Sequence, residues 1–217
     1  MTDHAISFIG SRALLFQPAC AFDLHSQQRI WALAEEAADW PGVREAVPGI
    51  TNLTLLLEAV PSEPDRILKD LAALWNTGRS KKPKGRLLEV PIIYGGKGGP
   101  HLQEVSDITG LSIDEVIRRH VAPDYTVYAL GSHAGYCYLG GLDPRLETPR
   151  RKVPLPRLPG GSLSLAGLQT GISASTGPSG WNTVGTAEVA FFDPARTPAA
   201  LLQPGDRIRL IPAEVIA

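Results

Sequence analysis

Hydrophobic positions in the first part of the chain follow two periods. Short apolar runs bounded by turn residues predict strands, and apolar residues spaced at i, i+3, i+4 and i+7 predict helices. The expected strands are Ala5–Ile9, Ala13–Phe16, Val43–Val47, Leu53–Glu58 and Leu87–Ile93, and the expected helices span about residues 26–39 and 64–76, with Ser26 as the first N-cap. This order predicts a ferredoxin-like α+β domain over residues 1–88, in which two helices cover one face of a sheet.

After residue 88 the pattern changes to short apolar runs separated by glycine and proline. The expected helices are about residues 101–109 and 112–120, with Ser112 as N-cap of the second, and the expected strands are Tyr125–Leu130, Ser162–Ala166, Glu188–Phe192 and Arg207–Ile211. Many short strands in such a length favour a closed barrel. Residues 89–217 are therefore predicted to form an all-β barrel with an inserted helical hairpin.

Composition narrows the classes of function. The 217 residues carry 21 basic and 22 acidic side chains, a formal net charge of -1, which is unlike a general nucleic-acid binder. No apolar run is long enough to span a membrane, and no signal peptide pattern opens the sequence, so a cytoplasmic protein is expected. The two cysteines, Cys20 and Cys137, provide neither a disulfide framework nor a four-thiolate zinc site.

Two segments resemble nucleic-acid motifs but are interpreted otherwise. The basic stretch 78–86 is expected to be a solvated loop, because the rest of the chain is neutral. Residues 102–117 have the spacing of a helix-turn-helix, yet their second helix would begin with Asp114 and Glu115, which phosphates repel. A helical hairpin inserted in the barrel is the preferred interpretation.

Candidate chemistry gathers after residue 90. Arg150 and Arg151 can bind a phosphate or carboxylate, and Gln169 with Thr170 offers neutral donors and acceptors to an amide. Glycine-rich stretches nearby let backbone N–H groups approach an anion. Cys137 with His133 could form a thiolate–imidazole pair, but a buried structural cysteine is the preferred interpretation. No His, Cys or Asp spacing predicts a metal site.

These segments carry a resemblance to a known family. The sequence is similar to the B subunit of 5-oxoprolinase, a family also called allophanate hydrolase subunit 1 and including a sporulation-kinase inhibitor. The matching strings are YGG at Tyr94–Gly96, GP at Gly99-Pro100, GLS at Gly110–Ser112, EVI at Glu115–Ile117, His120, YLGGLDPRL at Tyr138–Leu146, PRR at Pro149–Arg151, AG-x-QTGI at Ala166–Ile172, GW at Gly180-Trp181, FD at Phe192-Asp193 and LL-x-PGD at Leu201–Asp206.

The resemblance implies a small α/β domain followed by a cyclophilin-like barrel. It also implies a second barrel protein, the 5-oxoprolinase C subunit, and a third, the A subunit, which together open the lactam of 5-oxoproline at the expense of ATP. On this hypothesis the catalytic residues are His120, Arg150 and Arg151, and the substrate-binding residues are Gln169, Thr170, Gly171, Gly180, Trp181 and His133. Two alternatives are a carboxyltransferase component that uses biotin and a regulatory protein that inhibits a histidine kinase.

The chain departs from the family pattern near these residues. Where the family reads GF-x-PGF-x-YL, this sequence has Ser132, Ala134 and Tyr136. His101 replaces the usual Asp after GP, and Ser173-Ala174 replaces the usual Tyr-Pro after QTGI. Proline pre-sets a loop and phenylalanine anchors it, so the segment around residue 134 is expected to be more polar and looser. The sequence is that of a divergent member.

Overall fold

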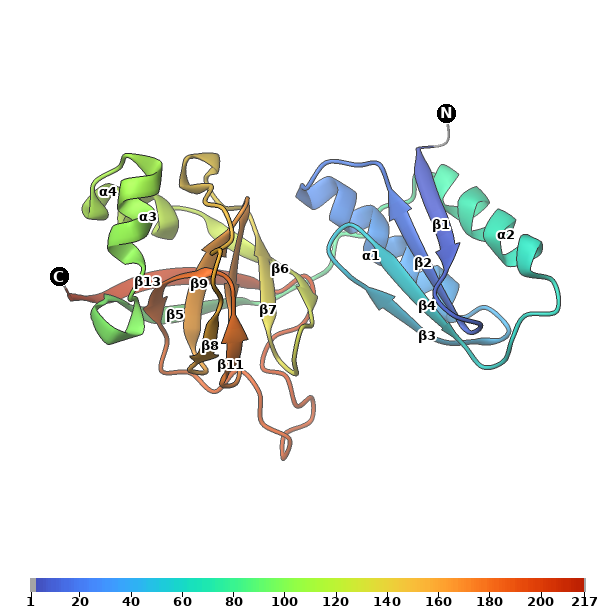
Figure 1. Cartoon of the computed structure of the whole chain (residues 1–217). Coiled ribbons are helices and arrows are strands. Elements are labelled where there is room, and N and C mark those ends of the chain that lie inside the picture. Colours follow the sequence, from blue (N-terminus) through green and yellow to red (C-terminus); the bar gives the residue numbers. More distant parts are fainter. Residues whose placement is uncertain (1–2, 217) are drawn as a thin grey trace. The chain divides into compact units, whose positions relative to one another are not determined.

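The computed structural model describes residues 3–216, which form two compact units that divide between Pro83 and Lys84 (Figure 1). The sequence analysis places the domain boundary after residue 88. In the structure Leu87 opens strand β5 (Leu87–Gly95), which pairs with strands of the second unit and not with the first sheet. The prediction that Leu87–Ile93 completes the N-terminal sheet is therefore wrong, because the strand finds its partners far along the chain.

The first unit is one antiparallel sheet with two helices. Its elements are β1 (His4–Phe8), β2 (Ala13–Pro18), α1 (Leu24–Ala38), β3 (Val43–Pro48), β4 (Leu53–Leu57) and α2 (Pro64–Asn76). The strands lie in the order β1-β2-β4-β3, so the ferredoxin-like detail is not confirmed. Asp23, and not Ser26, caps α1: its carboxylate accepts a hydrogen bond from the Ser26 amide at 2.7 Å. The core packs Leu14, Phe16 and Leu55 against Ile30 and Leu71.

The second unit is built on a closed seven-stranded barrel. Its strands follow the order β10-β7-β6-β13-β5-β12-β9, and β10 pairs with β9 to close the ring. The remaining barrel bounds are β6 (Asp124–Leu130), β7 (Cys137–Gly140), β9 (Ser162–Ala166), β10 (Gln169–Ile172), β12 (Asn182–Thr186) and β13 (Arg207–Ile216). β13 runs parallel to β5, and the other pairings are antiparallel. The predicted barrel is thus confirmed.

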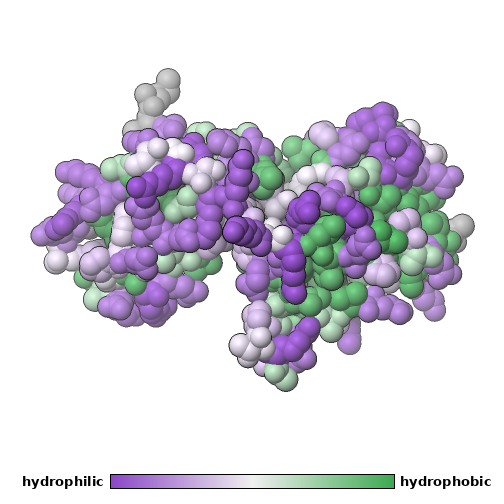
Figure 2. All heavy atoms as spheres, turned by 180° about the vertical axis from the view of Figure 1, so that it is seen from behind, coloured by the Kyte–Doolittle hydropathy of each residue, from purple (hydrophilic) through white to green (hydrophobic). Residues whose placement is uncertain are grey.

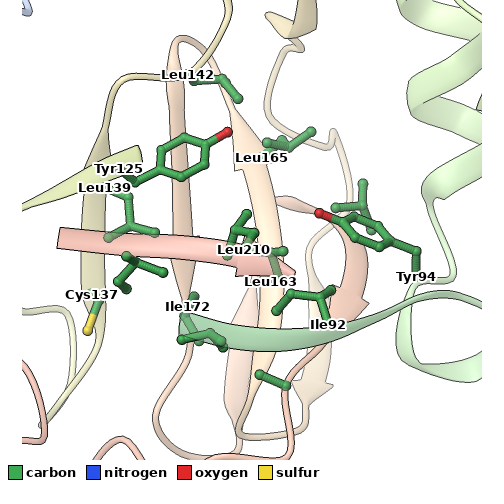
Figure 3. Close-up of a cluster of buried hydrophobic side chains, with 14 of the residues drawn as sticks. Ile92, Tyr94, Tyr125, Cys137, Leu139, Leu142, Leu163, Leu165, Ile172 and Leu210 are labelled. Atoms are coloured by element: carbon green, nitrogen blue, oxygen red, sulfur yellow. The ribbon is translucent and has the colours of Figure 1, made fainter. Parts of the chain in front are cut away.

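The middle of the barrel is packed with side chains. Figure 3 shows buried residues from facing strands pointing toward one another, among them Ile92, Leu139, Leu163, Leu165, Ile172 and Leu210. Each alternates along its strand with a residue on the outer face, as the two-residue period of a strand requires. A barrel filled in this way leaves the outer wall and the connections as the places for a binding site.

Two helices, α3 (Leu102–Thr109) and α4 (Ile113–Val121), are inserted between β5 and β6, as the sequence predicts. Ser112 caps α4 by accepting a hydrogen bond from the Glu115 amide at 3.3 Å. Two short 3-10 turns lie at Gly96–Gly98 and Pro144–Leu146. The predicted strand Glu188–Phe192 is wrong: this stretch is irregular, and only Phe192 forms an isolated bridge, to Ala200.

A small two-stranded sheet, formed by β8 (Leu155–Leu158) and β11 (Gly177–Ser179), belongs to the same unit. Figure 2 shows hydrophobic atoms among polar ones on one face of this unit. Among its exposed large hydrophobic side chains are Ile211, Val215 and Ile216 of β13. Within residues 3–216 no helix is both long and apolar enough to cross a membrane.

Candidate functional site

His120 lies inside the core of the barrel unit and is fully buried. The hydroxyl of Tyr94 lies 3.1 Å from its Nδ1, and Oγ1 of Thr170 lies 3.0 Å from its Nε2. Thr170 gives its own hydrogen to the carbonyl of Ser164 at 3.1 Å, so it accepts from Nε2. Nδ1 then accepts from Tyr94, and a neutral imidazole satisfies every group in this chain of hydrogen bonds.

The protonation of this network follows from its burial. Desolvation lowers the pKa of His120 to about 3, so the ring is neutral at physiological pH. Desolvation likewise raises the pKa of Tyr94. Cys137 also faces the core, where burial raises the pKa of its thiol to about 12, which leaves almost no thiolate to act as a nucleophile. These groups lie inside the core of the barrel unit and stabilise it.

Tyr138 and Ser164, on the outer wall of the barrel, line a different site, and Gly171 lies between them in the sheet. Gly171 pairs in register with Tyr138 on one neighbouring strand and with Ser164 on the other. The residues on either side of them along the strands face the core, so these three face outward. A Cβ on Gly171 would lie 2.5 Å from the hydroxyl of Tyr136, so the glycine makes room for that ring.

The outer wall bears a cavity of about 120 Å³. Loop 131–136, the segment around Arg150 and the β8–β11 sheet complete its walls. Its lining residues are Ser132, His133, Tyr136, Tyr138, Arg150, Leu158, Ser164, Ser173, Pro178, Ser179, Gly180 and Trp181. The volume is below the roughly 300–1,000 Å³ of sites for drug-sized ligands, so the cavity suits a small molecule.

Three aromatic rings pack together at this cavity. The centroids of Tyr136 and Tyr138 are 4.6 Å apart, and Trp181 lies 6.0 Å from each. Ring pairs at such distances stabilise one another beyond their simple burial. Burial also raises the pKa of Tyr136, so its hydroxyl stays protonated and can donate a hydrogen bond. The cluster gives the cavity a rigid, largely apolar wall.

Arg150 supplies the positive charge. Its guanidinium carbon lies 5.7 Å from the ring centroid of Trp181. The segment that carries it is fixed on both sides, since the Asn182 side chain donates to the Pro149 carbonyl at 2.9 Å and the Arg151 amide donates to the Gly180 carbonyl at 2.8 Å. Among the lining residues no carboxylate opposes this charge, so the cavity favours an anion.

His133 stands on a closed turn at the cavity. The His133 amide donates to the Gly131 carbonyl at 2.7 Å, and the Tyr136 amide donates to the His133 carbonyl at 3.1 Å. The imidazole packs edge-on against Tyr136, and its Nε2 lies 3.2 Å from the hydroxyl of Ser173. Burial lowers the pKa of His133 below its usual value. Ser132, in the same turn, has a φ of 62°, a backbone conformation that residues other than glycine rarely adopt.

The structure divides the residues that the sequence analysis selected. His133, Arg150, Gly180 and Trp181 line the cavity together. His120 and Thr170 lie in the core, and Arg151 forms an ion pair with Glu104. Gln169 is half-buried at the start of β10, and Gly171 lies beneath Tyr136. None of these five lines the cavity. His120 and Thr170 therefore cannot touch a ligand there without opening the core.

The sequence analysis did not select the other eight lining residues, among them Tyr136, Tyr138, Ser164 and Ser173. The sequence did carry a signal for Tyr136 and Ser173, because both are positions at which the chain departs from the family pattern. The alternation of Ser164 with Leu163 and Leu165 also places a polar side chain on the outer face of a core strand. Within residues 3–216 no group of three His, Cys, Asp or Glu side chains could hold a metal ion.

A larger groove, of about 800 Å³, lies in the first unit between Trp40, Val60 and α2. Its charged lining residues are Glu58, Glu63, Arg66 and Asp70. Arg66 is paired with both Glu63 and Asp70, at 3.5 and 3.8 Å. The groove thus lacks a free cation or a histidine beside its apolar surface, and the smaller cavity of the barrel unit has the more specific chemistry.

Known proteins are similar to this chain in sequence and in fold. The chain matches the carboxyltransferase domain, subdomain C and D, over residues 4–202. It is 39% identical over 204 residues to the B subunit of 5-oxoprolinase from Escherichia coli O157:H7, with 94% of each chain covered. The crystal structure of TTHA0988 is 36% identical, with a TM-score of 0.76 over 94% of this chain and 40% of that chain. Urea carboxylase of Kluyveromyces lactis has the same fold, with a TM-score of 0.83 and 18% identity over 97% of this chain and 22% of its own. The chain therefore belongs to the family of the 5-oxoprolinase B subunits, built on the carboxyltransferase C and D subdomains.

Proposed function

We infer that this chain is one component of an ATP-dependent complex that hydrolyses the cyclic amide 5-oxoproline. The observation that carries the proposal is the cavity in which Arg150 and an aromatic wall meet without an opposing carboxylate. Such a site suits a small ring that bears a carboxylate, because the guanidinium pairs with the anion and the rings contact the apolar face. The name of the 39% identical relative supports the choice of 5-oxoproline.

The reaction needs activation of a poor electrophile. Transfer of the γ-phosphoryl group of ATP to the lactam oxygen makes the carbonyl carbon of the ring electrophilic enough for water to attack it. The C–N bond then breaks, the ring nitrogen takes up a proton, and a second water releases phosphate to leave glutamate. The part of this chain is to bind the carboxylate and orient the ring, which lowers the entropic cost of the reaction. A cavity of about 120 Å³ does not hold a nucleoside triphosphate, so ATP belongs to the other subunits on this proposal.

The partner on this proposal is a second barrel protein, the 5-oxoprolinase C subunit, and the third component is the A subunit. The end of β13 supports the existence of a docking surface. Residues 212–216 of β13 pair with β5, whereas β6 pairs with β13 only over residues 207–209. Val215 and Ile216 are exposed there, 49% and 42% respectively. A strand segment that pairs on one side and bears exposed apolar side chains is a common site for pairing with another chain.

A carboxyltransferase component that uses biotin is the second candidate. It is favoured by the match to the carboxyltransferase domain over residues 4–202. The same cavity could hold the carboxylate of such a reaction, so geometry alone does not separate the two functions.

Purification of the chain with its partner proteins decides between them. The expected result is release of ADP that depends on 5-oxoproline and on all the subunits, with glutamate as product. Release at the background rate with the full complex contradicts the proposal. A biotinylated partner protein supports carboxyl transfer instead, and tight binding to a histidine kinase domain with no turnover supports a regulatory role.

A further inference from the structure

The side chains of His133 and Ser173 form a pair at the mouth of the cavity. Nε2 of His133 lies 3.2 Å from the hydroxyl of Ser173, and that hydroxyl donates its single hydrogen to the carbonyl of Ser175 at 2.8 Å. With its hydrogen used, Ser173 can only accept from the imidazole. The hydrogen of the neutral ring is therefore on Nε2, and Nδ1 carries a lone pair.

That lone pair is free. Within residues 3–216, Nδ1 of His133 has no hydrogen-bond or ion-pair partner, whereas the buried His120 has both of its ring nitrogens engaged. His133 is half-buried and lines the cavity. The ring is also held in place, since it packs edge-on against Tyr136 at 5.2 Å.

The charges around His133 favour the neutral ring. The titratable groups that line the cavity with it are Tyr136, Tyr138 and Arg150. The positive charge of Arg150 disfavours an imidazolium, and no carboxylate lines the cavity to stabilise one. Burial acts in the same direction and lowers the pKa of His133.

We propose that His133 is a specificity-determining residue of this site: its Nδ1 accepts a hydrogen bond from an N–H or O–H of a small anion whose negative group pairs with Arg150. Ser173 is a positioning residue, because it fixes the ring form that leaves Nδ1 free. The ligand class is thus a small monoanion that also carries a hydrogen-bond donor. A lactam carboxylate meets both requirements, and this step rests on the function proposed above.

Two ring acids that differ at one atom test the proposal on the whole chain. One is 5-oxoproline, and the other is the lactone carboxylate in which oxygen replaces the ring N–H. Binding is followed by the fluorescence of Trp181 or by calorimetry. We expect the lactam to bind roughly 3- to 10-fold more tightly, the loss expected when one neutral hydrogen bond is removed. The substitution His133→Asn should remove this preference, and His25→Asn, at an exposed histidine of the first unit, should keep it.

The preference for the lactam over the lactone should increase with pH. As pH rises through the pKa of His133, Nδ1 becomes an acceptor for the N–H that the lactam alone carries. The same rise removes a positive charge from the cavity, which weakens the binding of both carboxylates, so the ratio of the two affinities isolates the hydrogen bond. Equal affinity of the two acids, including no measurable binding of either, would overturn the role of His133 in recognition.

Nitrogen NMR of the histidine side chains tests the positioning role without any assay of turnover. We expect the neutral ring of His133 to carry its hydrogen on Nε2. Ser173→Ala should produce a mixture of the two ring forms and reduce the preference for the lactam, and Ser175→Ala, which keeps the accepting carbonyl, should change neither. A hydrogen on Nδ1, or a ring form that Ser173→Ala leaves unchanged, would overturn the proposal. A complex that fails to turn over 5-oxoproline contradicts the proposed function separately, because these measurements need only this chain.

Discussion

Nε2 of His120 lies 3.0 Å from Oγ1 of Thr170, and the hydroxyl of Thr170 gives its hydrogen to the carbonyl of Ser164. This geometry makes His120 part of the barrel core, where its other ring nitrogen accepts from Tyr94. Two polar side chains inside the core thus depend on one neutral imidazole. The resemblance alone had implied a catalytic role for the same residue.

Replacement of His120 by alanine should therefore reduce stability. The change leaves the hydroxyl of Tyr94 without its acceptor, removes the donor to Oγ1 of Thr170 and opens a cavity, which together cost about 2–4 kcal/mol of the free energy of unfolding. Chemical denaturation of the barrel unit within the whole chain measures this. The exposed His25→Ala should change the same free energy by less than about 0.5 kcal/mol. A stable His120→Ala protein that lacks only turnover would contradict the structural role.

The buried imidazole of His120 should also make the stability of the folded chain depend on pH. The pKa of His120 is about 3 in the folded state, against 6.5 for an unperturbed histidine. Between these values the unfolded chain binds a proton that the folded chain does not, so the contribution to stability is full above pH 6.5 and falls as pH is lowered toward 3. The slope is about 1.4 kcal/mol per pH unit. Comparison with His120→Gln isolates this effect from the carboxylates, and identical slopes in the two proteins would refute it.

Local patterns in the sequence predicted the elements better than their pairing. The strand that begins at Leu87 was predicted and is present, but its partner β13 begins at Arg207. The hydrophobic pattern of a short segment carries no information about a pairing with a strand so far along the chain. The same limit applies to the site. His120 and His133 look alike as isolated histidines in the sequence, and only the fold shows that His120, on α4, is buried in the core while His133, on the loop before β7, lines the cavity. Arg150, selected because a guanidinium can bind an anion, and Trp181, selected on the resemblance, both line the cavity.

Gly171 tests the packing beneath the ring of Tyr136. A methyl group there would lie 2.5 Å from the hydroxyl of Tyr136, so Gly171→Ala should displace this ring and cost about 1–3 kcal/mol of stability. Removing the hydroxyl with Tyr136→Phe should restore part of the loss in the double variant, which a double-mutant cycle measures. The matched control is Gly177→Ala, whose added methyl group meets no atom within 4 Å. Strictly additive effects of the two changes would show that Tyr136 is not the obstacle.

The exposed end of β13 tests the docking of a partner protein. Val215 is 49% exposed and lies in the part of β13 that pairs with β5 and not with β6, so Val215→Glu places a charge in the proposed interface with little effect on the folded chain. We expect the affinity for the second barrel protein to fall at least about tenfold, as measured by co-purification and sedimentation. Val153→Glu, at a residue that is 76% exposed elsewhere in the same unit, is the control. Equal loss in both variants, or in neither, would place the interface elsewhere.

Arg150 tests the anion site itself. Its guanidinium is exposed to solvent at the cavity, and the backbone around it is fixed by hydrogen bonds of Pro149 and Arg151. Arg150→Ala should therefore leave stability within about 0.5 kcal/mol while it removes the charge that pairs with the ligand carboxylate. We expect the KM of the assembled complex for 5-oxoproline to rise about 10- to 100-fold, the loss of roughly 1.5–3 kcal/mol for a charged hydrogen bond. Arg150→Lys should recover only part of this loss, because lysine keeps the charge but not the paired geometry of guanidinium and carboxylate.

The matched control is Arg157→Ala, which changes an exposed arginine of β8 that does not line the cavity and should leave KM unchanged. An unchanged KM in Arg150→Ala would mean that the substrate carboxylate binds elsewhere in the complex.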